Sequence, residues 1–76
     1  MNAARRARLA EVQAKLEELM CEIEAIADEE NDAYDNLPDS IRDSERGEKM
    51  SENVDVLYNI YNDLESVTAG IEEILE

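Results

Sequence analysis

Apolar residues recur at alternating spacings of three and four along both halves of the chain, and its one proline stands between the halves. Only a helix places residues with these spacings on one face. The first stripe consists of Leu9, Val12, Leu16, Leu19, Ile23 and Ile26. The second stripe consists of Met50, Val54, Leu57, Tyr61, Leu64, Thr68, Ile71 and Leu75. The pattern therefore predicts two long helices, over about residues 3–35 and 45–75, in an all-α fold without strands.

Residues 36–44 form the predicted connection between the helices. Pro38 disfavours helical geometry at Leu37, so the first helix should end there or just before. Asp43 or Ser44 can accept a hydrogen bond from the free amides at the start of the second helix. Leu37 and Ile41 supply apolar anchors, so we expect an ordered cap over the end of the two helices.

Two helices of matched length with a short connection favour an antiparallel, coiled-coil-like hairpin that takes up residues 1–76 as one domain. This folding sets Leu9 near Leu75 and Ile23 near Tyr61. It also brings a basic cluster at the start of the chain beside an acidic cluster at its end. These clusters are Arg5, Arg6 and Arg8, and Glu72, Glu73 and Glu76.

Each apolar stripe is wider than the contact within one hairpin requires. Met20 and Ala27 lie on a row beside the first stripe, and Ile60, Val67 and Ile74 lie beside the second. Wide stripes are typical of the core-facing helices of larger bundles. Leaving a large aliphatic side chain in water forfeits about 1.5–3 kcal/mol. We therefore expect a homodimer, a four-helix bundle whose interface consists of Met20, Ala27, Ile60, Val67 and Ile74.

The chain carries 21 acidic and seven basic residues, a formal net charge of −14. This charge disfavours direct binding to nucleic acid or to an anionic membrane and favours a basic protein partner. The single cysteine excludes an internal disulfide and fits a reducing compartment. The sequence has neither an apolar run long enough to span a membrane nor an apolar signal core at its start, so we expect a cytoplasmic protein.

One segment of the chain resembles a known group of proteins. It comprises Ala33-Tyr34-Asp35-Asn36-Leu37-Pro38-Asp39, followed by Ser44-Glu45-Arg46-Gly47-Glu48 and Met50. Over about residues 22–64 the sequence resembles small acidic proteins encoded by phages and gut bacteria, which share an aromatic-Asp-Asn-(Leu/Met)-Pro turn. That group has no assigned activity. The resemblance therefore implies a helical hairpin of mobile-element origin, and no catalytic or binding residue carries over.

No combination of residues indicates a catalytic or metal site. The acidic run from Asp28 to Asp32 lacks the alternating ligands and central glycine of a calcium loop, and the chain has no histidine for a di-iron bundle. Cys21 has no histidine or other base near it to activate it as a nucleophile. We expect no metal, no cofactor and no enzymatic activity.

Two hypotheses about function remain open. In the first, acidic rows imitate the phosphates of a nucleic acid and inhibit a nucleic-acid-binding defence protein, as anti-restriction and anti-CRISPR proteins do. Carboxylates four residues apart on a helix lie about 6 Å from each other, close to the phosphate spacing along one strand. The predicted rows are Glu17, Glu24, Asp28 and Asp35, and Glu11, Glu18, Glu22 and Glu29. In the second, the chain is a homo-oligomeric coiled-coil scaffold or regulatory module, and its acidity serves only solubility. A continuous acidic surface would favour the first hypothesis, and scattered acids the second.

Overall fold

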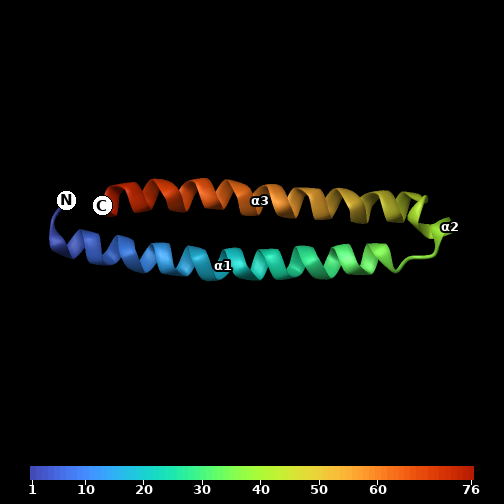
Figure 1. The fold of residues 1–76 in the computed structure, drawn as a ribbon, viewed down its shortest axis with the longest axis horizontal. Coiled ribbons are helices and arrows are strands. Elements are labelled where there is room, and N and C mark those ends of the chain that lie inside the picture. The colour runs from blue at the N-terminus through green and yellow to red at the C-terminus, as the bar shows by residue number, and fades with distance from the viewer.

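Two long antiparallel helices and a short third one make up the computed structural model, which describes all residues from 1 to 76 (Figure 1). Helix α1 runs over Ala3–Asp35, α2 over Asp39–Arg42 and α3 over Glu45–Leu75. The chain is 89% helical and has no strand, so the predicted all-α hairpin is confirmed. The molecule is a rod with extents of 59 × 14 × 14 Å. No helix is both long enough and apolar enough to cross a membrane.

The ends of the long helices coincide with the predicted bounds. α1 begins after Asn2, whose side chain accepts a hydrogen bond from the Arg5 amide at 2.9 Å. It ends at Asp35, because Pro38 disfavours helical geometry at the residue before it. α3 begins after Ser44, but the predicted side-chain cap is wrong: the Ser44 hydroxyl donates to the Ile41 carbonyl instead of accepting from α3.

Arg42 ties the connection to the end of α1. Its guanidinium donates to the carbonyl oxygens of Asp35 at 2.7 Å and Leu37 at 3.3 Å. It also lies 5.7 Å from the centroid of the Tyr34 ring, within the range of a cation–π contact. Cations near a helix C-terminus satisfy carbonyls that have no partner inside the helix. Leu37 and Ile41 are half-buried, as expected of an ordered cap.

Gly47 allows α2 to lie against the first turn of α3. It is one of the five buried residues of the chain. A Cβ atom at this position would lie 2.1 Å from the carbonyl oxygen of Arg42 and 2.6 Å from that of Ile41. Both neighbours are backbone atoms, which cannot move aside as a flexible side chain would. Only glycine therefore fits this close approach.

The contact between α1 and α3 is a seam in which both helices place residues at alternating spacings of three and four. From α3 it takes the predicted stripe, since every member from Met50 to Leu75 is buried or half-buried. The residues that α1 contributes to the seam differ from the predicted stripe. The α1 residues of the seam are Arg6, Leu9, Gln13, Leu16, Met20, Ile23, Ala27, Glu30 and Tyr34.

The predicted seam of α1 is therefore half wrong. Val12, Leu19 and Ile26 are 46%, 51% and 52% exposed, whereas Met20 and Ala27 are 6% and 0% exposed. The assignment of Met20 and Ala27 to a dimer interface is also wrong, because α3 already buries both side chains. Leu9, Leu16 and Ile23 belong to both the predicted stripe and the observed seam. The spacing of apolar residues alone therefore does not decide which of the two sets faces α3. The observed seam row continues from Met20 and Ala27 to Tyr34, whose ring lies 5.7 Å from the Arg42 guanidinium.

The two chain ends lie side by side at the end of the rod opposite α2 (Figure 1). The Arg6 guanidinium donates to the carbonyl of Ile74 at 3.2 Å and also to that of Leu75. The arginines at the start of the chain form no ion pair with the glutamates at its end. The two salt bridges are local, joining Arg42 to Asp39 at 3.7 Å and Lys49 to Glu52 at 4.0 Å. Arg6 instead binds carbonyls that the last turn of α3 leaves unpaired.

Candidate functional site: two unlike faces of the hairpin

The two sides of the hairpin can be defined from its seam. In each helix, heptad positions a and d face the other helix, and positions e and g flank them on either side. Because the helices run antiparallel, both e rows lie on one side of the rod and both g rows on the other. The Tyr58 hydroxyl, at position e of α3, donates to Asp28 Oδ1 on α1 at 2.5 Å. Asp28 occupies position b, next to the e row of α1, so this hydrogen bond agrees with the assignment.

One side carries only negative charge, and we call it the acid face. It consists of positions e and b of both helices, where every charged residue is a carboxylate exposed to solvent. These carboxylates are Glu17, Glu24, Asp28, Asp35, Glu48, Asp55, Glu65 and Glu72. No lysine or arginine occupies either row of either helix. The acid face is therefore continuous across α1 and α3.

The acid face imposes a negative potential on Tyr58, which lies within it, and on Tyr61, which lies beside it in the seam. The pKa of Tyr58 is raised above 10.0 chiefly by its hydrogen bond to Asp28, then by burial and by the charges of Asp28, Glu24 and Asp32. The pKa of Tyr61 is raised by the charge of Glu24, then by burial and by Glu65 and Cys21. In each case carboxylates disfavour the tyrosinate anion. Residues of both helices therefore contribute to one electrostatic site.

Of the two rows of carboxylates predicted on α1, one lies on the acid face and the other lies outside it. Glu17, Glu24, Asp28 and Asp35 lie together on the acid face. Of the second row, Glu11 and Glu18 occupy position f, on the back of α1. Glu22 and Glu29 occupy position c and border the opposite side of the rod, so they do not extend the acid face.

Four carboxylates of the acid face were missed by the sequence analysis, which considered only α1. They are Glu48, Asp55, Glu65 and Glu72 of α3. The heptad frame of the second stripe already places them at positions b and e. Applying the antiparallel pairing to both helices at once would have found them.

The opposite side carries six exposed aliphatic residues at the g positions, and we call it the apolar face. Their exposed fractions run from 39% to 52%. The residues are Val12, Leu19 and Ile26 of α1, and Ile60, Val67 and Ile74 of α3. Five of the seven bases lie at g and c positions on this side, namely Arg5, Arg8, Lys15, Arg46 and Lys49.

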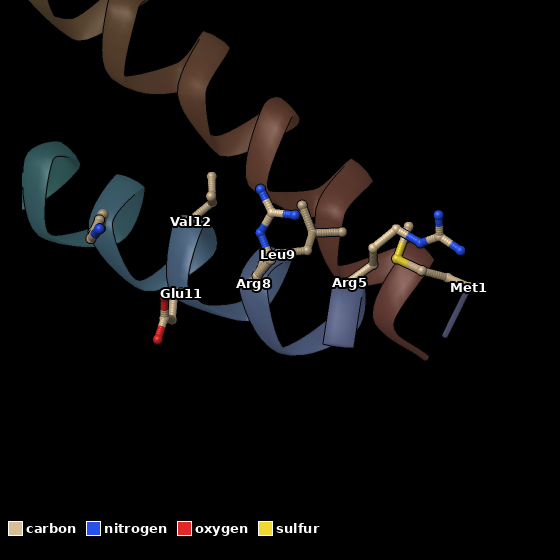
Figure 2. Close-up of a pocket in the computed structure, with 7 residues that line it drawn as sticks. Met1, Arg5, Arg8, Leu9, Glu11 and Val12 are labelled. Atoms are coloured by element: carbon tan, nitrogen blue, oxygen red, sulfur yellow. The ribbon is translucent and has the colours of Figure 1, made fainter. Parts of the chain in front are cut away.

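The basic end of the apolar face is a shallow depression at the start of α1 (Figure 2). Its lining consists of Met1, Arg5, Arg8, Leu9, Glu11, Val12 and Lys15. Figure 2 shows the side chain of Glu11 directed away from Val12. The bases and the exposed aliphatic side chains therefore lie on one side of the rod, and the other side carries carboxylates without bases.

The chemistry available to these faces is recognition by charge and by apolar contact. No group of three or more His, Cys, Asp or Glu side chains is arranged to hold a metal ion. Cys21 is exposed and forms no disulfide. Comparison of the chain with known protein families, with curated proteins and with solved structures finds no match.

Proposed function

We propose that this protein is a non-enzymatic binding module whose acid face occupies the nucleic-acid-binding surface of a basic protein. Its class of action is that of an inhibitor that imitates a nucleic acid, of the anti-restriction or anti-CRISPR type found on mobile elements. The chain itself does not bind DNA, RNA or a membrane, since its net charge of −14 repels anionic surfaces.

The observation that supports this proposal is the separation of charge between the two sides of the rod. Eight exposed carboxylates from two helices share one side, and no base interrupts them. Carboxylates also lie beside the bases on the other side, at position c (Glu22, Glu29 and Asp63), whereas no base lies at any e or b position, so the bases are confined to one side and the acids are not. A surface of one sign raises the rate of encounter with a partner of opposite sign and orients the encounter.

The spacing within the acid face suits a phosphate-binding partner. Glu24 and Asp28 are four residues apart, so their carboxylates lie about 6 Å from each other. Glu65 and Glu72 of α3 add a second line of charge beside that of α1. Two parallel lines of negative charge on a rigid rod resemble the two strands that border a groove of a duplex.

The test measures binding of the purified protein to a panel of basic nucleic-acid-binding proteins, restriction endonucleases and CRISPR effectors among them. A supporting result is binding that weakens steeply with salt and is displaced by duplex DNA or RNA. The acid-face variant carries Glu17→Gln, Glu24→Gln, Asp28→Asn and Asp35→Asn and should lose this binding. Its control carries Glu11→Gln, Glu18→Gln, Glu22→Gln and Glu29→Gln and should retain most of it.

The two variants have equal net charge, so they separate the position of the acids from their number. Equal loss of binding in both would show that only total charge matters. Failure of the native protein to bind any member of the panel at low salt would count against the proposal and in favour of a scaffold.

A second function, homo-oligomerisation, is favoured by a different observation. Six aliphatic side chains at the g positions, and Val56 at position c, remain 39–54% exposed on one side of the hairpin. Contiguous apolar patches of this kind mark interaction sites. Self-association through the apolar face leaves the acid face free, so the two functions are compatible.

A further inference from the structure

We propose that the apolar face binds the apolar face of a second copy, with α1 packed antiparallel on α1 and with the two-fold axis passing beside Leu19 and Val67. This proposal deepens the homo-oligomeric function and rests on it. It replaces the interface predicted from the sequence, because Met20 and Ala27 are enclosed within each hairpin. It adds Val12, Leu19 and Ile26 to Ile60, Val67 and Ile74.

The apolar face is centred on the middle of α1 and on the second half of α3. α1 covers Ala3–Asp35, so Leu19 is its middle residue, with Val12 and Ile26 one heptad to either side. Val67 has Ile60 and Ile74 one heptad to either side, and it lies seven residues beyond Ile60, the middle residue of α3. A half-turn about an axis beside Leu19 and Val67 therefore sets Val12 opposite the partner's Ile26 and Ile60 opposite the partner's Ile74. Leu19 and Val67 each meet their own counterpart, as residues on a two-fold axis must.

The available area is sufficient for a stable dimer. The rod is 59 Å long and 14 Å wide, so one side offers about 800 Å², the area that each partner contributes to an interface of standard size. Because the axis passes beside the middle of α1, the two copies overlap along most of their length. A displaced axis would leave part of the apolar face uncovered.

The same rotation places the basic residues that border the apolar face on α1 of one copy opposite the acidic residues that border it on the other copy. Position c of α1 carries, in order, Arg8, Lys15, Glu22 and Glu29, two bases followed by two acids. The midpoint of this series lies between Lys15 and Glu22, next to Leu19. A half-turn there sets Arg8 opposite the partner's Glu29 and Lys15 opposite the partner's Glu22. Each pairing occurs twice in the dimer.

The competing arrangement places the two-fold axis along the rod, so that α1 of one copy packs on α3 of the other. Glu22 of one copy then faces the partner's Asp63, since both occupy position c at the same height on the rod. No base lies between these two carboxylates. Like charges brought together oppose such a dimer, whereas the antiparallel pairing of α1 with α1 gives attraction at the same positions.

The first experiment determines the mass of the native protein in solution by sedimentation equilibrium at physiological salt. The expected result is twice the 8.6 kDa of one chain. The double variant Leu19→Lys/Val67→Lys should weaken the dimer at least about a hundredfold, because four aliphatic side chains of the interface are lost. Ala25→Lys/Ser66→Lys makes the same charge change at position f, outside the interface, and should leave the mass unchanged.

The second experiment tests the pairing of charges and does not depend on an apolar substitution. Lys15→Glu sets carboxylates opposite each other in a homodimer, and Glu22→Lys sets ammonium groups opposite each other. Each variant alone should dimerise about three- to tenfold more weakly than the native protein. A mixture of the two should form the heterodimer in preference, because every pair in it is again of opposite sign. Circular dichroism of each variant checks that the hairpin remains helical.

The third experiment fixes the position of the axis. In a Cys21→Ser background, the single variants Leu19→Cys and Val67→Cys should each form an intermolecular disulfide on mild oxidation, because each residue meets its own counterpart. A dimer in which neither variant crosslinks would overturn the proposed interface and leave homo-oligomerisation standing. A native protein that remains monomeric at high micromolar concentration would overturn both. Neither result bears on the acid face, whose partner binding is measured separately.

Discussion

Gly47 and Gly70 lie in the same helix in opposite surroundings. A Cβ atom at Gly47 would overlap the backbone of α2, whereas at Gly70 it would meet nothing within 4 Å. Gly47→Ala should therefore lower the free energy of unfolding by about 1–3 kcal/mol through overpacking. Gly70→Ala should raise it by about 0.5–1 kcal/mol, since glycine in a helix interior is less favourable than alanine. Urea denaturation measures the free energy of unfolding of both variants and so tests both predictions. Changes of the same sign would contradict the described approach of α2 to α3.

Tyr58, which lies in the acid face, should ionise at a higher pH than an ordinary tyrosine. The pKa of Tyr58 is raised above 10.0 by its hydrogen bond to Asp28, then by burial and by the charge of the same carboxylate. The group is neutral in the folded state when the unfolded chain already begins to ionise. Its contribution to stability is therefore complete below about pH 10 and is lost as the pH rises through the folded pKa. Tyrosinate absorbance during an alkaline titration measures the effect.

The matched variant for this titration is Asp28→Asn, which removes the charge and keeps an oxygen that can accept the hydrogen bond. It should lower the pKa of Tyr58 toward its ordinary value. Glu11→Gln, on the back of α1, serves as the control and should leave the titration of Tyr58 unchanged. An unchanged midpoint in Asp28→Asn would mean that the hydroxyl and the carboxylate do not meet in solution.

On the scale of the helices, the seam predicts which apolar residues hold the hairpin together. Leu64 is half-buried between α1 and α3, whereas Leu19 is 51% exposed on the apolar face. Leu64→Asp should abolish most of the helical circular dichroism, since an unpaired charge in the seam costs several kcal/mol of a small total. Leu19→Asp should keep the helical signal while shifting the protein to monomers. Equal loss of helicity in both variants would restore Leu19 to the seam.

The helices themselves were predictable from the sequence, and the rotation of α1 was not. Pro38 and the uninterrupted stripes predicted both helix bounds, because these features act through local backbone geometry. Two apolar rows of α1 have equally good spacing, and the more aliphatic one includes Leu19. The structure instead buries the row of Met20 and Ala27, which continues to Tyr34 and so to Arg42. Helical spacing does not determine that choice, because both rows satisfy it equally.

The acid face was predictable in part for a related reason. Glu17, Glu24, Asp28 and Asp35 share one edge of α1 whichever row forms the seam. The contribution of α3 depends on which side of the rod its e row occupies, and that follows only when both seams are known. Glu22 and Glu29 were grouped with Glu11 and Glu18 by spacing along the chain. Their place beside the apolar face depends on the rotation that the sequence left open.

On the scale of the whole molecule, the net charge of −14 on a rod of 59 Å should make stability depend on salt. Most carboxylates are exposed and have no basic partner, so they repel one another across the surface. Screening shortens this repulsion from about 30 Å at 0.01 M salt to about 3 Å at 1 M. The melting temperature should therefore rise with sodium chloride at neutral pH. A melting temperature that fell with salt would indicate ion pairs that the structure does not contain.

The contact between Arg6 and the carbonyls of Ile74 and Leu75 has a consequence for the connectivity of the chain. Because the first and last turns already touch, a few added residues would close the backbone into a ring. New termini could then be opened within residues 39–43, at the opposite end of the rod. Such a circular permutant would keep both long helices and both faces while reversing their order of synthesis. A label attached to the termini would then lie at the opposite end of the rod. This would help where a bound partner covers the end that now carries the termini.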